Sequence, residues 1–144
     1  MLCLHLQSSR AERKRLELLM RANDKPLSDC RILVVEDEYL IADDLRRTLS
    51  RLGAEVVGPA STLDQAFQLL AAEPVDCAVL DVNLEGEMVY TLAEQLRRDQ
   101  VPIVVATGYD DTFLSNRIAA AAVLEKPCSQ ELLSRTVINA CAKS

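Results

Sequence analysis

The sequence predicts an α/β protein built on a doubly wound, five-stranded parallel sheet. Two observations support this prediction. From Cys30 onward, strand-like and helix-like segments alternate five times, which is typical of parallel strands joined by crossover helices. Strand-like segments such as residues 75–81 are apolar almost without interruption, as expected for strands that helices cover on both faces.

The first strand and helix are predicted from apolar spacing and a terminating glycine. An apolar run at residues 32–35 forms the strand, and the helix begins after Glu38 and ends at Gly53. Glycine readily adopts the left-handed conformation that closes helices. Five apolar residues of this helix are expected at the core-facing spacing: Leu40, Ile41, Leu45, Leu49 and Leu52.

The remaining segments continue the alternation. They are a strand at residues 55–59, a helix opened by residues 61–64, a strand at 75–81, a helix at 89–98, a strand at 101–107, a weak helix at about 112–120, a strand at 121–124 and a last helix. The hydroxyls at the start of the second helix and Ser129 at the start of the last can cap those helices. The expected core residues are Ala66, Leu69 and Leu70 in the second helix and Leu132, Leu133, Val137 and Cys141 in the last.

Residues 1–28 differ from the rest and are predicted to be an N-terminal extension to a single domain at residues 29–144. A basic run at residues 10–15 precedes several leucines, and the pattern ends near residues 23–26, which suggests a short helix. Two interpretations remain open. The segment is a solvated or frayed extension, or it is a helix that packs on the domain or on a second copy of the chain.

Composition argues against several classes of function. The net charge is −6, with five aromatic residues and no Trp, so neither base stacking nor attraction to DNA or acidic membranes is expected. The first residues are too short and interrupted for a secretory signal, and no apolar run approaches membrane-spanning length. Five cysteines without Cys-x-x-Cys spacing, together with one His, make zinc binding improbable and fit a reducing cytoplasm.

Polar residues follow the ends of the apolar strands and predict one chemical site. They are Glu36, Asp37, Asp81, Thr107 and Lys126, and the carboxyl ends of parallel strands share one edge of a sheet. Clustered carboxylates repel unless a cation lies among them, and Mg²⁺ prefers such oxygen ligands. Asp81 can act as a nucleophile toward phosphorus, while the Thr107 hydroxyl and the Lys126 charge would stabilise the phosphoryl oxygens.

With these five residues in this order, the chain resembles the receiver domain of bacterial two-component response regulators over about residues 30–143. The resemblance implies a flavodoxin-like receiver fold with strand order 2-1-3-4-5. It also implies that Glu36, Asp37, Asp81 and the backbone carbonyl of Asn83 hold Mg²⁺, for which Mn²⁺ can substitute. A sensor histidine kinase or histidine phosphotransfer protein would phosphorylate Asp81, Thr107 and Lys126 would contact the phosphoryl group, and a cis peptide would join Lys126 to Pro127.

Two features depart from many receivers and are similar to the stand-alone "FATGUY" subgroup. Val123 occupies the position of an aromatic switch residue, and the span from Thr107 to Lys126 is short. Residues 106–109, Ala-Thr-Gly-Tyr, match part of the subgroup's namesake stretch, whereas Ile103, Val105 and Asp110 depart from it. Gly108 is expected to leave the site mouth open, and Tyr109 is either a packing residue or a gate.

The expected function is a single-domain response regulator that catalyses only its own phosphorylation and dephosphorylation and signals through protein contacts, as a monomer or homodimer. A pseudo-receiver that binds partners without phosphorylation remains an alternative, because Val123 replaces the aromatic. A phosphohydrolase with an Asp nucleophile is a weaker alternative. Such enzymes carry a second Asp two residues after the nucleophile, where this chain has Asn83.

Overall fold

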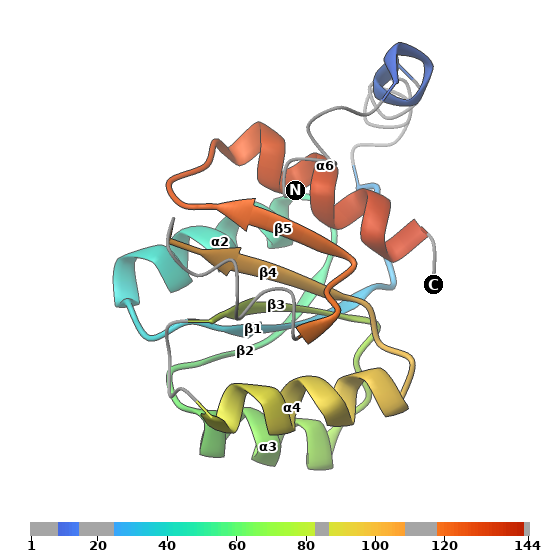
Figure 1. The fold of residues 1–144 in the computed structure, drawn as a ribbon. Coiled ribbons are helices and arrows are strands. Elements are labelled where there is room, and N and C mark those ends of the chain that lie inside the picture. The colour runs from blue at the N-terminus through green and yellow to red at the C-terminus, as the bar shows by residue number, and fades with distance from the viewer. Residues whose placement is uncertain (1–8, 15–24, 83–86, 109–117, 143–144) are drawn as a thin grey trace.

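A computed structural model of the chain describes residues 9–14, 25–82, 87–108 and 118–142. Its centre is a five-stranded parallel sheet in the order β2-β1-β3-β4-β5 (Figure 1). The strands are β1 (Arg31–Val35), β2 (Glu55–Ala60), β3 (Cys77–Asp81), β4 (Ile103–Thr107) and β5 (Ala122–Glu125). The helices are α2 (Tyr39–Arg51), α3 (Leu63–Ala72), α4 (Glu87–Arg98) and α6 (Gln130–Ala142). The predicted fold class and strand order are therefore confirmed.

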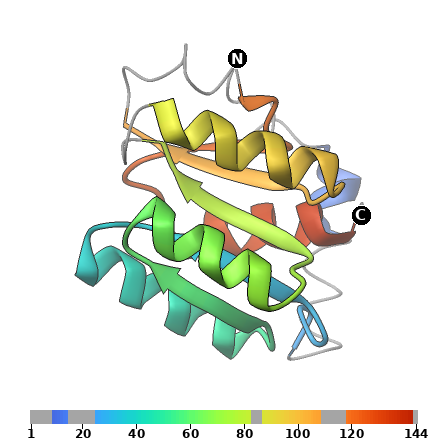
Figure 2. The same cartoon turned by 90° about the horizontal axis from the view of Figure 1, so that it is seen from below.

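Helices cover both faces of the sheet. In Figures 1 and 2, α2 and α6 lie on one face and α3 and α4 on the other. Successive residues of β1 alternate between the two cores: Ile32 and Val34 pack toward α2 and α6, whereas Leu33 and Val35 pack toward α3 and α4. Since adjacent strand side chains point to opposite faces, burial on both sides explains the uninterrupted apolar runs.

The predicted element ends differ from the observed ones by one or two residues. The fourth strand begins at Ile103 rather than at residue 101. The backbone N–H of Val101 donates to Leu96 at 2.9 Å, which ties Val101 to the end of α4 instead of to the sheet. The predicted weak helix at about 112–120 falls mostly outside the described residues.

The predicted inward stripe of α2 is wrong at Leu40. This side chain is 79% exposed, while Ala42, Leu45 and Leu49 are buried. At 3.6 residues per turn, Leu40 lies about 140° around the helix from Leu45 and about 180° from Leu49. Leu40 was predicted to face the core because it is apolar, but its position around α2 puts it on the solvent side of the helix.

The predicted helix ends at Gly53 and Ser129 are confirmed. Gly53 follows α2 with a φ of 101°, and an added Cβ there would lie 2.7 Å from the Lys25 Cβ. The Ser129 side chain accepts a hydrogen bond from the Leu132 N–H at 3.0 Å, which caps α6. Local sequence signals therefore set both ends correctly.

Two parts of the predicted extension are described. Residues 10–14 form a short helical segment. Leu27, by contrast, is buried in the core shared by α2 and α6, and its N–H donates to the Leu52 carbonyl at 2.8 Å. The segment just before β1 therefore packs as part of the globular core.

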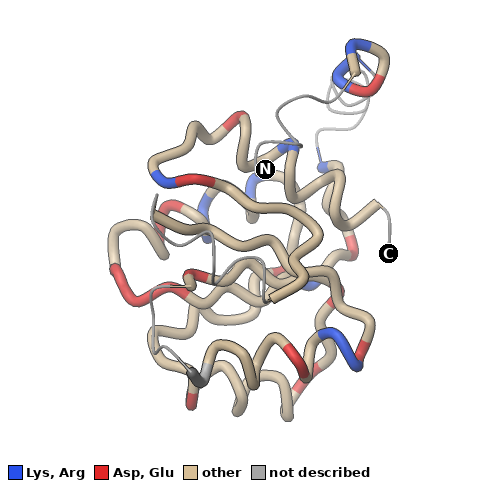
Figure 3. Tube along the Cα trace, in the orientation of Figure 1, with Lys and Arg blue, Asp and Glu red and all other residues tan. Residues whose placement is uncertain are grey.

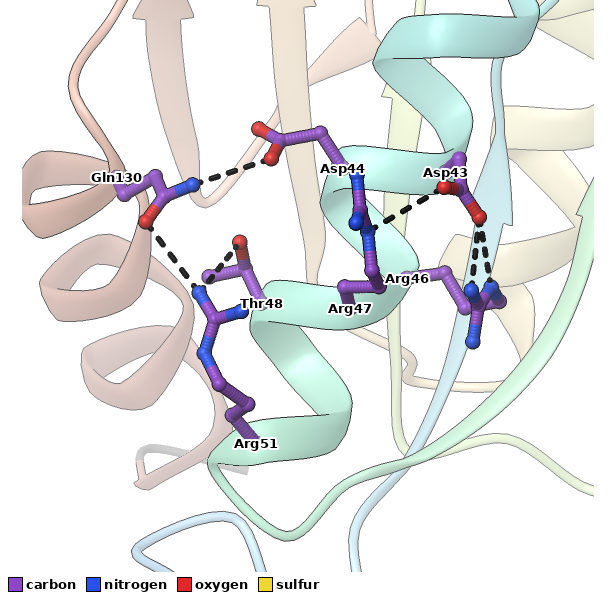
Figure 4. Close-up of polar contacts among 7 residues, drawn as sticks. All are labelled: Asp43, Asp44, Arg46, Arg47, Thr48, Arg51 and Gln130. Atoms are coloured by element: carbon purple, nitrogen blue, oxygen red, sulfur yellow. Dashed lines mark hydrogen bonds and ion pairs between the residues drawn. The ribbon is translucent and has the colours of Figure 1, made fainter.

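A polar network on the surface joins α2 to α6 (Figure 4). The Gln130 side chain accepts a hydrogen bond from Arg51 at 3.3 Å and donates one to Asp44 at 3.1 Å. Along α2 itself, Asp43 pairs with Arg46 and Arg47 at 2.8 and 3.3 Å. The Gln130 contacts link the start of α6 to α2, and the start of α6 directly follows the segment that carries Lys126.

Among the described residues, no helix combines the length and apolar character needed to cross a bilayer.

Candidate functional site

Three carboxylates meet at the carboxyl edge of the sheet. Glu36 and Asp37 follow β1, and Asp81 is the last residue of the neighbouring strand β3. One oxygen from each lies within 4.8 Å of the other two. Glu36 and Asp81 are only 2% and 4% exposed, whereas Asp37 is exposed. Figure 3 shows acidic residues in the loop between β1 and α2, at this end of the sheet.

Lys126 brings a positive charge to the buried carboxylates. Its Nζ donates to Glu36 Oε1 at 3.0 Å and lies 3.4 Å from Asp81 Oδ2. Its backbone N–H donates to the Thr107 carbonyl at 2.8 Å, so the end of β4 holds the residue in register. The bond between Lys126 and Pro127 is cis, as the resemblance implied.

Thr107 is the buried last residue of β4, between the ends of β3 and β5. Its hydroxyl donates to the Gly108 carbonyl at 2.9 Å. In the ladder between β3 and β4, Asp81 pairs with Ala106, the residue before Thr107. The sheet therefore places a hydroxyl, a carboxylate and an ammonium group at neighbouring strand ends.

Electrostatics at this edge favour a bound cation. Burial raises the pKa of Glu36; hydrogen bonds from the Glu38 N–H and from Lys126 offset part of that rise, and the Asp81 charge adds to it. Burial lowers the pKa of Lys126, but the Glu36 hydrogen bond and the Asp81 charge outweigh this and raise it overall. One ammonium thus contacts two of the three clustered carboxylates. The oxygen atoms of the three are hard ligands that fit Mg²⁺.

The structure brings five of the predicted site residues to one edge. These are Glu36, Asp37, Asp81, Thr107 and Lys126. Val123 instead lies within β5, paired with Val105 and only half-buried. Asn83 and Tyr109 lie outside the described residues.

Two backbone contacts at the site were not predicted from the sequence. The Glu38 N–H donates to Glu36 Oε2 at 3.1 Å, and the Glu36 N–H donates to the Ala60 carbonyl at the end of β2 at 2.9 Å. The first contact orients the Glu36 carboxylate, and the second anchors the Glu36 backbone to β2. Backbone donors leave no residue-type signal, although the short Glu-Asp-Glu turn makes the first contact possible.

Known proteins are similar to this chain in sequence and in fold. A sequence model of the response regulator receiver domain matches residues 32–138. The chain is 33% identical over 111 residues to the sensory transduction protein LytT of Bacillus subtilis, covering 74% of this chain and 46% of that protein. It is 33% identical over 103 residues to the transcriptional regulatory protein PdtaR of Mycobacterium tuberculosis, covering 69% of this chain and 50% of that protein. The chain belongs to the response regulator receiver family.

Solved structures agree with this assignment. A response regulator receiver protein from Burkholderia phymatum superposes with a TM-score of 0.70 at 27% identity, covering 79% of this chain and 96% of that one. The response regulator PhyR from Brucella abortus superposes with a TM-score of 0.73 at 24% identity, covering 96% of this chain and 58% of that one, which shows the fold alone. The chain spans about half the length of LytT and PdtaR, at 46% and 50%.

Proposed function

We propose that this chain is a phosphoacceptor in a two-component phosphorelay, with Asp81 as the phosphorylated residue. The observation that supports this most directly is the contact of Lys126 with both Glu36 and Asp81, at 3.0 and 3.4 Å, beside a cluster of three carboxylates. The family supplies the expected donor, a sensor histidine kinase or histidine phosphotransfer protein.

In the proposed reaction, an Asp81 carboxylate oxygen attacks the phosphorus of a phosphohistidine. The new O–P bond forms as the P–N bond breaks, and the imidazole nitrogen leaves with a proton taken from solvent. Lys126 is placed to stabilise charge on the transferred phosphoryl oxygens. The Thr107 hydroxyl can turn from the Gly108 carbonyl to donate to the same group. Its movement would change the packing after β4 and so present a different surface to a protein partner.

The carboxylates of Glu36, Asp37 and Asp81, with the Asn83 carbonyl, are proposed to hold Mg²⁺. When bound, the ion would neutralise the clustered negative charge and the charge of the incoming phosphoryl oxygens. Glu36 is the residue with the strongest structural support for this role, because it is buried and two donors orient its carboxylate.

Intact-protein mass spectrometry after incubation with phosphoramidate or acetyl phosphate and magnesium tests the proposal. Wild-type protein is expected to gain one phosphoryl group, and Asp81→Asn none. Asp64→Asn removes an exposed carboxylate in the first turn of α3 and is the matched control, expected to behave as wild type. A gain that persists in Asp81→Asn would place the modification elsewhere.

Two alternatives give different results in related assays. A pseudo-receiver, suggested by Val123, would remain unmodified with small donors and with a panel of phosphorylated histidine kinases. A phosphohydrolase would turn over generic phosphate esters many times per molecule. The proposed receiver instead transfers at most one phosphoryl group to itself before its acyl phosphate hydrolyses.

A further inference from the structure

Two cysteine thiols meet at the opposite edge of the sheet from the candidate site. Cys30 directly precedes β1, and Cys141 lies in the last turn of α6. Their sulfur atoms are 3.0 Å apart, although 111 positions separate them in the sequence. Both are thiols in this structure. Neither thiol lies in the cluster of carboxylates, Lys126 and Thr107. The proposed phosphorylation therefore does not explain why the two thiols are in contact.

A surface pocket gives access to both thiols. Its volume is about 600 Å³, and the lining includes Cys30 and Cys141 together with Leu27, Asp76, Val101 and Ile138. Cys141 is only half-buried, whereas Cys30 is at the limit of burial. Because Cys141 is the more exposed residue of the two, we place the first reaction with a small neutral oxidant such as hydrogen peroxide at Cys141.

We propose that Cys30 and Cys141 form a reversible disulfide when the protein meets a peroxide, linking the start of β1 to the end of α6. The present separation of 3.0 Å exceeds the length of a disulfide, roughly 2.0 Å, by about 1 Å. Closing that gap brings the two sulfur atoms about 1 Å nearer, and Cys141 lies in the last turn of α6, close to the end of the described residues.

The oxidation proceeds in two balanced steps. The Cys141 sulfur attacks one peroxide oxygen, the O–O bond breaks, and a sulfenic acid and one water form. The Cys30 sulfur then attacks the sulfenic sulfur, the S–S bond forms as the S–O bond breaks, and a second water leaves. Two thiols lose two electrons and two hydrogens in total, and one peroxide becomes two waters. A dithiol reductant reverses the bond by exchange.

Other described cysteines are placed less well for this bond. Cys77 opens β3 and is fully buried, although it also contacts Cys141. Cys128 precedes α6, whereas Cys141 lies in the last turn of that helix, so about 17 Å of helix lies between them. Cys77 is therefore the one competitor for Cys141 among the described residues, and Cys128 serves as a control.

The reaction is expected to be slow. The contact with Cys141 and burial both raise the pKa of Cys30. The contact with Cys30 lowers the pKa of Cys141, but the Cys77 contact and burial raise it to about 12. Because the thiolate is the reacting form, the pair should resist trace oxidant and respond to sustained peroxide exposure.

Peptide mapping of peroxide-treated protein tests the proposal directly. Wild-type protein is expected to lose two hydrogens without forming dimers, and tandem mass spectrometry should identify a peptide link between Cys30 and Cys141. Cys30→Ser and Cys141→Ser should each prevent that loss, whereas Cys128→Ser should retain it. Melting curves under reducing conditions verify that each variant is folded.

Stability provides a second measurement that does not depend on the variants. A bond that closes a loop of more than a hundred residues should raise the Tm of oxidised wild type by roughly 5 °C or more, and dithiothreitol should reverse the rise. The proposal is wrong if the mapped link joins Cys141 to Cys77, if only sulfinic acid products appear, or if no link forms.

Discussion

The two edges of the same parallel sheet hold charged side chains in different surroundings. At the amino edge, Arg31 pairs with Glu55 and Glu73 at 2.8 and 2.7 Å, so each charge has a partner beside solvent. At the carboxyl edge, Lys126 contacts the buried carboxylates of Glu36 and Asp81, and the exposed Asp37 belongs to the same carboxylate cluster. The charges of the first edge are partly exposed, so solvent screens them. The second edge buries Glu36 and Asp81, and a bound cation would relieve the repulsion between them.

This difference indicates which edge of the sheet is suited to the proposed chemistry. Both edges are supported by the same apolar strands, which pack on α2 and α6 and on α3 and α4. Removing a charged contact at the amino edge should leave phosphorylation unaffected. The carboxyl edge depends on a few buried polar side chains, so single substitutions there should affect phosphorylation strongly.

The largest difference in phosphorylation rate should be the one between Lys126→Met and Arg31→Met. Removing the Lys126 ammonium takes away the positive charge beside Asp81, and phosphorylation with a small donor should slow by about a hundredfold or more. It should also destabilise the protein by about 1–3 kcal/mol, because the buried Glu36 loses a partner. Urea unfolding and time-resolved mass spectrometry measure both effects.

Arg31→Met serves as the matched control for that experiment. It breaks both ion pairs of Arg31 at the amino edge and should leave the phosphorylation rate within about twofold of wild type, since effects on distant sites are independent. Equal slowing by both substitutions would contradict the assignment of function to the carboxyl edge.

Glu36→Gln should change how stability depends on pH. Because burial raises the pKa of Glu36 in the folded state, the folded protein holds this proton at pH values where the unfolded chain has released it. The corresponding stability is fully present below the ordinary glutamate value of 4.5 and is lost as pH rises through the raised pKa. Glu36→Gln should flatten this part of the metal-free stability curve.

Magnesium should counteract that loss of stability more strongly in wild type than in Glu36→Gln. If Glu36 helps to hold the ion, added Mg²⁺ should restore stability at neutral pH in wild type and less in Glu36→Gln, by linkage. A wild-type curve that does not change with Mg²⁺ would argue against a metal site at these carboxylates.

Thr107→Ala should have an intermediate effect. It removes one hydroxyl donor, and one hydrogen bond of about 1.4 kcal/mol corresponds to about a tenfold change in rate. Thr107→Ser keeps the hydroxyl and should remain within about threefold of wild type. Single-turnover phosphorylation kinetics measure the difference, and equal rates for both variants would exclude a role for the hydroxyl.

Gln130→Ala should have the smallest effect. Its contacts with Arg51 and Asp44 link α2 to α6 on the exposed surface (Figure 4), and such contacts are worth about 1 kcal/mol or less. Chemical denaturation should show a loss within that range and an unchanged phosphorylation rate. A marked slowing would mean that the start of α6 positions Lys126 through this network.

The sequence predicted the fold well because the relevant signals are local. Apolar runs marked each strand, Gly53 and Ser129 marked helix ends, and Glu36, Asp81 and Thr107 stood at the ends of three such runs. Parallel strands share one carboxyl edge, so their meeting followed from the fold class. The prediction was wrong at Leu40, which was placed in the core because it is apolar, although its position around α2 puts it on the solvent side.

The sequence by itself determined the alternation of elements, the order of the polar residues along the chain and the edge where they meet, because each of these follows from patterns a few residues long. Tertiary structure alone decided that Lys126 donates to Glu36 as well as approaching Asp81, and that Leu27 joins the core. It also decided that Cys30 meets Cys141 across 111 positions. Such contacts depend on how helices pack against the sheet, and residue types along the chain do not encode that distance.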